Sequence, residues 1–366
     1  MDYEKLVQEK NDSNTVENIP IIVFMSIVCS AGIIGNFVAL LFYVSRKDKS
    51  AATLVLTALS GNDLICSIVL LSSTAWLTHS MTYTNVAACK IHSFLNHVFV
   101  MNSMFLLFIL ALDRYLSICN TSKWKSLFAR RKTVSNIVCN TGLSILFSIR
   151  QLVFSDVVPI DFTVAENVTL TGNRCKTTSE KRLAKIAKAF TIFDFILVIM
   201  GMILMLTLYT LIIRKVSSVG KRRCAARNNI VTDESQPTEV SQISVNFVKQ
   251  SSNEKTVVER NRPSTTGQNT INVSKTLHWS ATIERRLTKM AFILTLAFVL
   301  SFVPFFVVSI IGTIHTQLPI WALVLYRSYA LNSTMNPYLI GYYNSEFREF
   351  VKKITTCRFL PSLRRK

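Results

Sequence analysis

Seven apolar segments of membrane-spanning length make up most of this 366-residue chain. The hydrocarbon core of a bilayer is about 30 Å thick, so a helix that rises about 1.5 Å per residue needs about 20 apolar residues to cross it. Because lipid offers no partner to exposed backbone polar groups, each segment is expected to be a helix. The segments are residues 19–44, 52–76, 91–118, 134–158, 186–216, 287–314 and 320–342. The fourth is the weakest, since it carries Asn136, Asn140 and Arg150. The predicted fold class is an all-α membrane protein, a seven-transmembrane helix bundle.

The distribution of basic residues predicts the orientation of the bundle. Half of the residues are hydrophobic and 17% are charged, yet the formal net charge is +20, which suits a membrane protein with basic loops. Lys and Arg follow the first and third segments, whereas the connections 78–88 and 312–321 contain none. The basic connections are therefore expected in the cytoplasm and residues 1–18 outside the cell, as an extracellular tail. Residues 1–17 are acidic and polar, so we expect no cleavable signal peptide and a multi-pass protein of the plasma membrane.

The predicted bundle covers residues 19–344. One polar segment is inserted in it, and another segment follows it. Residues 217–282 are rich in Ser, Thr, Asn and Gln without an apolar period, so we expect a disordered third cytoplasmic loop. Residues 345–366 form the cytoplasmic end of the chain. Its first part, residues 345–355, carries Phe347, Phe350 and Ile354 on one face and Arg348 and Lys352 on the other. This pattern predicts a short amphipathic C-terminal helix along the inner membrane surface.

Five residues are candidates for covalent modification. Of the eight cysteines, Cys89 and Cys175 face the oxidising side, so we predict a disulfide between them, two free thiols being the alternative. Asn11 and Asn167 begin N-x-Ser/Thr sequences on the same side and are glycosylation candidates, although the same pattern recurs at cytoplasmic positions. Cys357 follows the amphipathic helix and is a palmitoylation candidate, with a free thiol as the alternative.

Polar residues inside the spans discriminate among classes of seven-span protein. The third segment ends in Asp113-Arg114-Tyr115, roughly 37 Å along the helix from Cys89, and a charged pair there is a functional candidate, with a snorkelling pair as the alternative. Further positions are Gly35-Asn36, Asp63 within Leu59-Ser60-Gly61-Asn62-Asp63-Leu64, Tyr209, Phe298, Pro304 and Asn332-Ser333-Thr334-Met335-Asn336-Pro337. Together with the two extracellular cysteines, their order and spacing resemble the rhodopsin-like (class A) G-protein-coupled receptors, over nearly everything outside the tails and the third cytoplasmic loop.

This resemblance implies an allosteric sodium site around Asp63, in the middle of the second segment. Its predicted members are Asn36, Asp63, Ser103, Asn332, Ser333 and Asn336. An oxygen-rich cage around one carboxylate suits a hard cation. The alternative is an Asp63 that is protonated or bonded to water without sodium. No other cofactor is expected.

The resemblance also implies a switch for G-protein coupling. Its predicted members are Asp113, Arg114, Tyr115, Tyr209, Glu284, Phe298, Phe302, Pro304, Asn336 and Pro337. Glu284 precedes Pro304 by 20 residues, roughly 30 Å of helix, so it is expected level with Arg114. An ion pair between them would hold the inactive state, unless Glu284 pairs with Arg285 or Arg286 instead. The two prolines are expected to kink their helices, and outward movement of the sixth helix would admit a G protein.

Four positions depart from the family's pattern. Phe302 stands where the family has a tryptophan, and Ile340 stands where it has a tyrosine that contacts Tyr209, a role that Tyr343 could take over. Gly201 replaces the proline of the fifth segment, and the fourth segment contains no tryptophan. These departures indicate a divergent branch with altered basal activity.

The predicted ligand pocket lies at the outer ends of the helices. Its members are Asn96, His97, Arg150, Phe305, Phe306, Ser309, Tyr326 and Arg327. Asn96 stands where amine receptors carry an aspartate, and Ala330 stands where opsins carry the retinal lysine, so neither ligand is expected. Arg150 and Arg327 would receive the carboxylate of a peptide or lipid, unless they make structural contacts or Asp194 neutralises one of them. We favour a peptide.

The sequence thus predicts a receptor that couples an extracellular ligand to a heterotrimeric G protein. Arrestin, receptor kinases and the lipid bilayer are further expected partners, and nucleic acid is not. The five histidines show no metal-ligand spacing and no internal repeat is evident, so we expect neither an enzyme nor a transporter. The rival hypothesis, prompted by Phe302 and Ile340, is a receptor-like scaffold or decoy that binds ligand or arrestin without activating G proteins.

Overall fold

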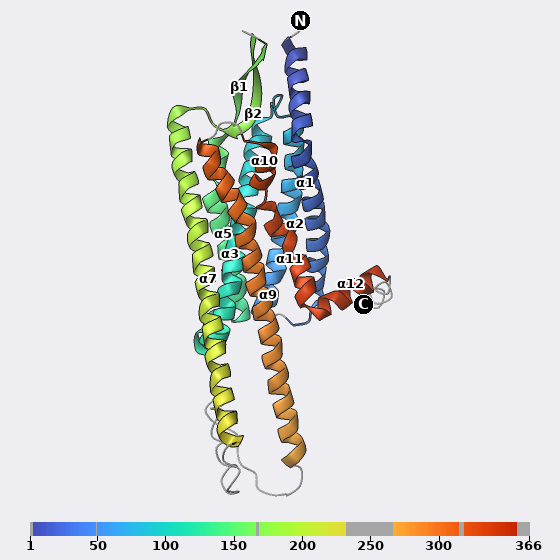
Figure 1. Cartoon of the computed structure of the whole chain (residues 1–366), viewed down its shortest axis with the longest axis vertical. Coiled ribbons are helices and arrows are strands. Elements are labelled where there is room, and N and C mark those ends of the chain that lie inside the picture. Colours follow the sequence, from blue (N-terminus) through green and yellow to red (C-terminus); the bar gives the residue numbers. More distant parts are fainter. Residues whose placement is uncertain (1–2, 49, 166–167, 232–265, 315–317, 357–366) are drawn as a thin grey trace. The chain divides into compact units, whose positions relative to one another are not determined.

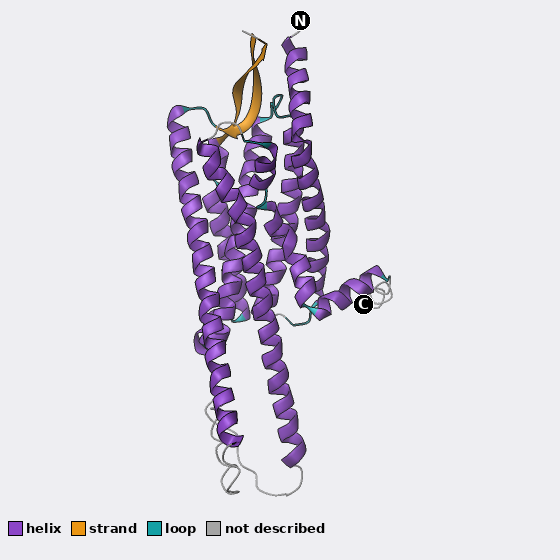
Figure 2. Ribbon diagram, viewed as in Figure 1, coloured by secondary structure: helices purple, strands orange, loops and turns teal. Residues whose placement is uncertain are grey.

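A computed structural model describes residues 3–48, 50–165, 168–231, 266–314 and 318–356 of the chain (Figure 1). The chain forms two compact units, one of residues 1–209 with 286–366 and one of residues 210–285. The first unit is a bundle of helices with a single β-hairpin at one end (Figure 2). In chain order the elements are α1 (Tyr3–Ser45), α2 (Ala51–Thr78), α3 (Val86–Cys119), α4 (Thr121–Leu127), α5 (Arg130–Ser148), α6 (Gln151–Phe154), β1 (Ser155–Ala165), β2 (Val168–Thr177), α7 (Lys181–Val231), α9 (Thr266–Ile314), α10 (Ile320–Tyr326), α11 (Ala330–Tyr343) and α12 (Ser345–Thr355).

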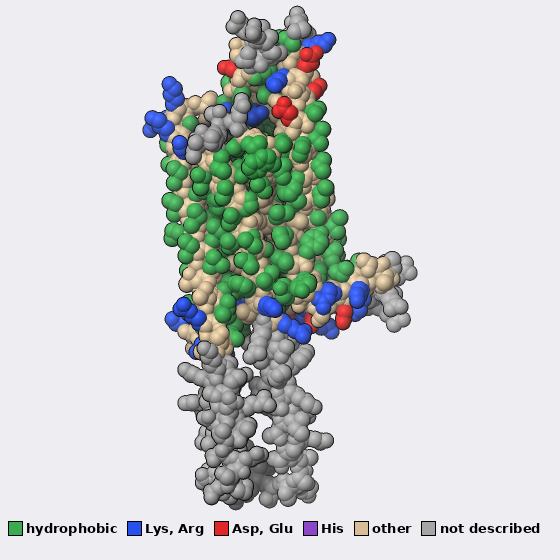
Figure 3. Space-filling model, in the orientation of Figure 1, with side chains coloured by type: hydrophobic (Ala, Val, Ile, Leu, Met, Phe, Trp, Pro, Cys, Tyr) green, Lys and Arg blue, Asp and Glu red, His purple; other side chains and the backbone are tan. Residues whose placement is uncertain are grey.

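Within the described residues, six stretches are long and apolar enough to cross a membrane as helices, and they lie in α1, α2, α3, α5 with α6, α7 and α9. Large hydrophobic side chains cover the outside of the bundle in a continuous band, with charged side chains beyond its edges (Figure 3). The predicted helical membrane fold is confirmed. The predicted amphipathic C-terminal helix is present as α12, where Phe347 is buried against Phe42 and Arg46 forms an ion pair with Glu346.

The seventh predicted span consists of two shorter helices, α10 and α11. Tight turns join them, in which the Arg327 N–H bonds to the Val324 carbonyl and the Ala330 N–H bonds to the Arg327 carbonyl. Each piece is shorter than a full span, which is why the chain has six long helices and one divided one. The Ser328 hydroxyl in the break donates to the Ser301 carbonyl of α9 at 2.7 Å. Ser301 lies one turn before Pro304, where the proline disturbs the helical hydrogen bonds, so the broken helix stabilises the kinked one.

Close helix contact fixes the position of α1 against α11. A Cβ atom on Gly35 would lie 2.6 Å from Pro337 Cγ, and one on Gly32 would lie 2.9 Å from Thr334 Oγ1. The Thr334 hydroxyl donates to the Val28 carbonyl at 3.0 Å, and Asn36 Nδ2 donates to the Ser333 carbonyl at 2.7 Å. Small residues let two helices approach closely in lipid, and the polar groups then bond between them.

The predicted extracellular tail, residues 1–18, is helical from Tyr3 and continuous with the first span. Asn11 is 2% exposed, and its amide bonds at both ends to the connection between α2 and α3. Its Nδ2 donates to the Thr78 carbonyl at 2.9 Å, and its Oδ1 accepts from the Met81 N–H at 3.1 Å. A glycan would be attached to this Nδ2. This amide therefore has structural bonds in the folded chain, and glycosylation of Asn11 stays a prediction, while Asn167, the other candidate, lies outside the described residues.

The connection between α6 and α7, the predicted second extracellular loop, is a two-stranded antiparallel hairpin of β1 and β2, which the sequence did not predict. Residues 155–158, expected at the end of the fourth span, belong to β1 instead. Cys175 on β2 is bridged to Cys89 at the start of α3, so the predicted disulfide is confirmed. The hydroxyl of Tyr3 accepts from the Thr171 N–H and donates to its carbonyl, so α1 holds the hairpin from the other side.

The second unit, residues 210–285, contains the cytoplasmic ends of α7 and α9. The helices continue to Val231 and resume at Thr266, so the prediction that residues 217–282 are disordered is wrong at both ends of that range. The remainder, residues 232–265, lies outside the described residues, as does the palmitoylation candidate Cys357.

Candidate functional site

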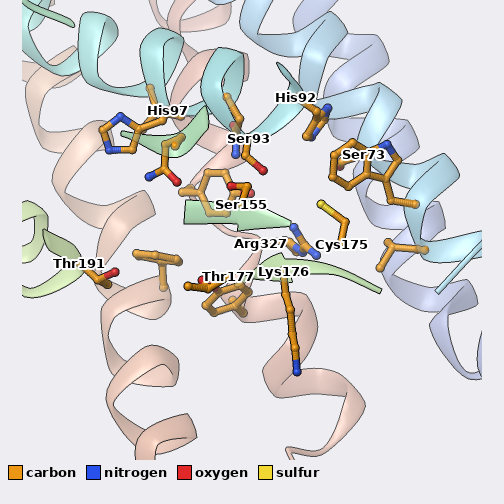
Figure 4. A pocket seen from close by; sticks show the side chains of 18 of the residues that line it. Ser73, His92, Ser93, His97, Ser155, Cys175, Lys176, Thr177, Thr191 and Arg327 are labelled. Atoms are coloured by element: carbon orange, nitrogen blue, oxygen red, sulfur yellow. The ribbon is translucent and has the colours of Figure 1, made fainter. Parts of the chain in front are cut away.

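A cavity of about 720 Å³ opens at the end of the bundle that carries the hairpin, lined by side chains of α1, α2, α3, α7, α9, α10 and the hairpin. Figure 4 shows side chains of α3, of the two strands and of Arg327 around it. Six of the eight residues predicted for the ligand pocket line it, namely Asn96, His97, Phe305, Phe306, Tyr326 and Arg327. The other two, Arg150 and Ser309, are not among the lining residues, and the Ser309 hydroxyl bonds to the Phe305 carbonyl of its own helix.

Arg150 is paired with Asp194, the carboxylate that the sequence analysis named as an alternative partner for one of the two arginines. Arg150 Nη2 bonds to Asp194 Oδ2 and lies 3.0 Å from His97 Nε2. His97 Nε2 is 3.3 Å from the same Asp194 oxygen, and His97 Nδ1 is 2.7 Å from the Ser148 hydroxyl. The Arg150 guanidinium also lies 5.0 Å from the Phe190 ring centre. The charge of Arg150 is thereby balanced by Asp194, which agrees with the structural contact that the sequence left as the alternative to ligand binding.

Three other cations line the cavity, Arg174, Lys176 and Arg327, and among the described lining residues Asp194 is the one carboxylate. The Arg327 guanidinium lies 5.8 Å from the Tyr326 ring centre and bonds to Tyr329. Arg174 Nε donates to the Ser80 carbonyl at 3.1 Å, and burial lowers the pKa of this guanidinium, because its charged form is poorly solvated there. The lining therefore has an excess of positive charge and is suited to an anionic group.

An aromatic cluster forms the floor of the cavity. Phe302 contacts Phe298 at 4.7 Å between ring centres on its cytoplasmic side and Phe306 at 6.0 Å on its outer side. Phe305 stacks on Phe195 at 6.0 Å. Phe302 is thus the ring that touches both the cavity and the helix interior below it, the position expected of an aromatic switch. Sequence reasoning missed Phe195 and the close pair of Trp76 and His92, whose rings are tilted with centres 4.0 Å apart, because aromatic residues are common in every span.

The predicted sodium-site residues meet around Asp63, which is fully buried. Asn336 Nδ2 donates to Asp63 Oδ2 at 2.6 Å, and the hydroxyls of Ser103 and Ser333 lie close enough to the carboxylate to interact with it. Asn332 Nδ2 donates to Ser103 Oγ at 3.3 Å. Asn36 stands back from the carboxylate and bonds to the Ser333 and Gly32 carbonyls.

Two oxygens beside this centre have no hydrogen-bond donor among the described residues. They are Asn332 Oδ1 and Asn336 Oδ1, both fully buried. A buried acceptor without a donor costs about 1–3 kcal/mol, and a hard cation satisfies such oxygens as well as a donor does. A carboxylate, two amide oxygens and two hydroxyls form a donor set that fits sodium.

The cytoplasmic end of α3 holds Arg114 in a buried pair with Asp113. Arg114 Nε donates to Asp113 Oδ2 at 2.9 Å, and Nη2 bonds to the same oxygen. The other carboxylate oxygen, Oδ1, accepts from the indole N–H of Trp124 at 2.8 Å. Trp124 lies on the short helix α4, and sequence reasoning missed it because loop tryptophans carry no signature of their own. The predicted partner of Arg114, Glu284, has its side chain outside the described residues.

Two further switch residues, Tyr115 and Tyr209, pack against apolar side chains, Tyr115 half-buried and Tyr209 fully buried. Tyr115 packs beside Leu116 and Phe128, and the Tyr209 ring contacts Phe292 at 5.3 Å between centres. Ile340, which replaces the family's tyrosine, is 1% exposed. Tyr343, the suggested substitute, lies with its ring centre 5.9 Å from Lys289 Nζ and 4.9 Å from the Tyr342 ring.

Comparisons with known proteins agree with these observations. A family model described as 7 transmembrane receptor (rhodopsin family) matches residues 35–339. Among curated proteins, a bombesin receptor of Bombina orientalis is 28% identical over 134 residues, which are 36% of this chain and 34% of that receptor. The chain thus matches about a third of the length of that relative.

Proposed function

Since this chain belongs to the rhodopsin family of seven-transmembrane receptors, we propose that it is a G-protein-coupled receptor of the plasma membrane, with its N-terminus outside the cell. Binding of an extracellular ligand activates a heterotrimeric G protein through outward movement of the cytoplasmic part of α9. The observation that carries this proposal is the buried Asp113–Arg114 pair with its Trp124 partner. A charged pair at this depth is costly to bury, and a pair that opens in the active state gives the chain two states to switch between.

The kinked helix supplies the movement. Pro304 removes one helical hydrogen bond from α9, and Phe302 lies between the cavity and the turn below it. A ligand that presses on the aromatic floor therefore acts on the residue next to the kink. Arg114 and Tyr209 stabilise the open state, and the change is a shift between populations, not a chemical reaction.

The ligand is a peptide that carries an acidic group. The cavity combines an aromatic floor with Arg174, Lys176 and Arg327, which suits an amphipathic ligand with a carboxylate. The partial likeness to a bombesin receptor supports a peptide. Asp194 is a poor anchor for an amine, because Arg150 and His97 both bond to its Oδ2 and Arg150 balances its charge.

Sodium binds at Asp63 as an allosteric ion and stabilises the inactive state. This part of the proposal is supported by the unsatisfied oxygens of Asn332 and Asn336. Arrestin and receptor kinases act on the cytoplasmic face after activation, and Glu284 forms a second lock on Arg114.

A second candidate function is a scaffold that binds ligand or arrestin without activating G proteins. The observation in its favour is Ile340, which is fully buried and supplies no hydroxyl near Tyr209. The two candidates differ in whether nucleotide exchange occurs at all.

Nucleotide exchange on a panel of heterotrimers tests the proposal without a ligand. We expect Asp113→Asn to raise basal exchange on one class of G protein, because it weakens the hold on Arg114, and we expect Arg114→Ala to abolish that rise. Glu284→Ala tests the second lock in the same assay. Arrestin recruitment by the wild type with no exchange from any variant, on any heterotrimer, would favour the scaffold.

A further inference from the structure

Three buried asparagines connect Asp63 to the fourth spanning helix. Asn62 Nδ2 on α2 donates to Asp63 Oδ1 at 3.3 Å, and Asn102 Nδ2 on α3 donates to Asn62 Oδ1 at 2.8 Å. Asn140 Nδ2 on α5 donates to Asn102 Oδ1 at 2.7 Å. We name Asn62, Asn102 and Asn140 the amide chain. Each side chain is 6% exposed, and amides at this depth in a membrane are expensive unless they bond to one another.

The direction of every bond in the amide chain follows from one backbone carbonyl. Asn62 Nδ2 also donates to the Phe99 carbonyl at 2.9 Å, and a carbonyl can only accept. The nitrogen of Asn62 must therefore face Phe99 and Asp63, which turns its oxygen toward Asn102. That oxygen requires a donor, so Asn102 presents its nitrogen to Asn62 and its oxygen to Asn140. Asn140 must then donate, and all three amides point their N–H groups toward Asp63.

Aligned amides act on Asp63 as a row of dipoles. The positive end of each faces the carboxylate, which stabilises the negative charge on Asp63, and hydrogen bonds in a series polarise one another. The effect is strong where water is excluded, because low local polarisability weakens screening. An Asp63 held in its charged form is the form that binds a cation.

The amide chain includes one of the buried polar residues of α5. Thr133, Asn140, Ser144 and Ser148 are buried along this helix. Thr133 and Ser144 bond to carbonyls of the turn before them, while Ser148 also contacts His97 of α3 at 2.7 Å, nearer the hairpin end of the bundle. Asn140 reaches across to Asn102 of α3 at 2.7 Å, with a longer contact from the neighbouring Thr141 hydroxyl at 3.4 Å.

We propose that Asn140 is a positioning residue for the Asp63 centre, which it reaches through Asn102 and Asn62, and that it raises the affinity of this centre for sodium. The inference rests on the proposed sodium site and adds to it a determinant on another helix, two amides away from the carboxylate. It also gives α5 a part in the receptor that its sequence, without a tryptophan, did not indicate.

The test measures the thermal stability of the purified full-length protein in NaCl and in choline chloride at equal ionic strength. A thiol-reactive dye reports unfolding, because Cys29 and Cys66 are buried in the bundle. Asn140→Leu removes the donor while keeping the branching and the number of heavy atoms, and Ser144→Ala is the matched control on the same buried face of α5. Asn140→Ser, too short to reach Asn102, serves if the leucine variant does not fold. A titration with NaCl gives the sodium concentration at half of the stabilisation.

We expect sodium to stabilise the wild type and Ser144→Ala alike. In the Asn140 variant the half-saturating concentration rises about fivefold, the equivalent of one hydrogen bond of about 1 kcal/mol. In a protein that already carries Asn62→Ala, adding Asn140→Leu does not change the half-saturating sodium concentration further, because the amide chain is already interrupted. An Asn140 variant that is less stable but keeps the wild-type sodium titration overturns the inference and leaves the sodium site standing. If sodium does not stabilise the wild type, and Asp63→Asn shows the same lack of response, both the inference about Asn140 and the proposed sodium site are overturned.

Discussion

Replacing Trp124 by phenylalanine removes one N–H group from the cytoplasmic end of the bundle and leaves an aromatic ring in its place. The indole N–H donates to Asp113 Oδ1 at 2.8 Å, while both contacts from Arg114 go to Oδ2. The ring itself packs beside Leu116 and Phe128, and phenylalanine retains most of that packing. The substitution therefore isolates the hydrogen bond to a buried carboxylate from the rest of the side chain.

The size of the effect follows from the burial of the two partners. A hydrogen bond to a charged group contributes about 1.5–3 kcal/mol to the state that contains it. Asp113 is fully buried but Trp124 is only half-buried, so we take about 1 kcal/mol, because water replaces part of the lost bond. If the active state of the free receptor is a minor population, this loss raises that population about fivefold.

The assay is ligand-free nucleotide exchange on the heterotrimer identified by the wild type. We expect Trp124→Phe to raise the basal rate about fivefold. Trp124→Tyr retains a donor on an aromatic ring, so we expect its basal exchange rate to lie between those of the wild type and Trp124→Phe. Trp321→Phe is the matched control, since it makes the same chemical change at a residue that is 63% exposed at the other end of the bundle.

The reasoning is refuted if Trp124→Phe leaves exchange at the wild-type rate while Asp113→Asn raises it. Such a result would mean that Arg114 alone holds Asp113 and that Trp124 is a packing residue. A lower rate in Trp124→Phe would mean instead that the indole belongs to the surface that receives the G protein.

Three further predictions concern the extracellular half. Removing the disulfide with Cys89→Ala and Cys175→Ala destabilises the protein by about 4 kcal/mol in the chain-entropy model, because the bridge closes a loop across 86 positions, and thermal unfolding measures it. Asn11→Ala costs about 1–3 kcal/mol through two lost backbone bonds, and its electrophoretic mobility tests the predicted glycan, because a variant that has lost a glycan migrates faster. Arg327→Gln weakens the response to an acidic peptide agonist at least tenfold but spares its C-terminally amidated analogue, and equal losses for both would contradict an acidic anchor.

The sequence sufficed for the spans and the disulfide because the bilayer imposes a simple rule on each. Apolar length predicts a crossing, and the positive-inside rule assigns Cys89 and Cys175 to one side. The hairpin was missed because residues 155–158 are apolar enough to continue a span, and the pairing of β1 with β2 decides their structure. The break in the seventh span was also missed because a contact between distant residues decides it. It depends on a hydroxyl of Ser328 and a carbonyl of Ser301, 27 positions apart.

The candidate site was predictable where side chains share one helix or one motif. Asn332, Ser333 and Asn336 recur on one face of α11, so their meeting at Asp63 could be expected. Contacts between helices had no such signal. Asn62 and Asn102 are 40 positions apart, and Trp124 reaches Asp113 from a separate helix.

The polar residues that made the fourth segment the weakest span are the ones that attach it to the bundle. Lipid is as apolar as leucine, so apolar side chains give a helix no preference for protein over lipid, and polar groups must supply it. Asn140 bonds to α3, and Arg150, next to α6, bonds to Asp194 on α7. Asn136 is only half-buried, with a long contact of 3.5 Å to the Leu127 carbonyl. A polar residue within a predicted span therefore indicates attachment to the bundle where its side chain faces another helix. Of the polar residues that made this segment the weakest predicted span, only Asn136 fits the interpretation of a weak span.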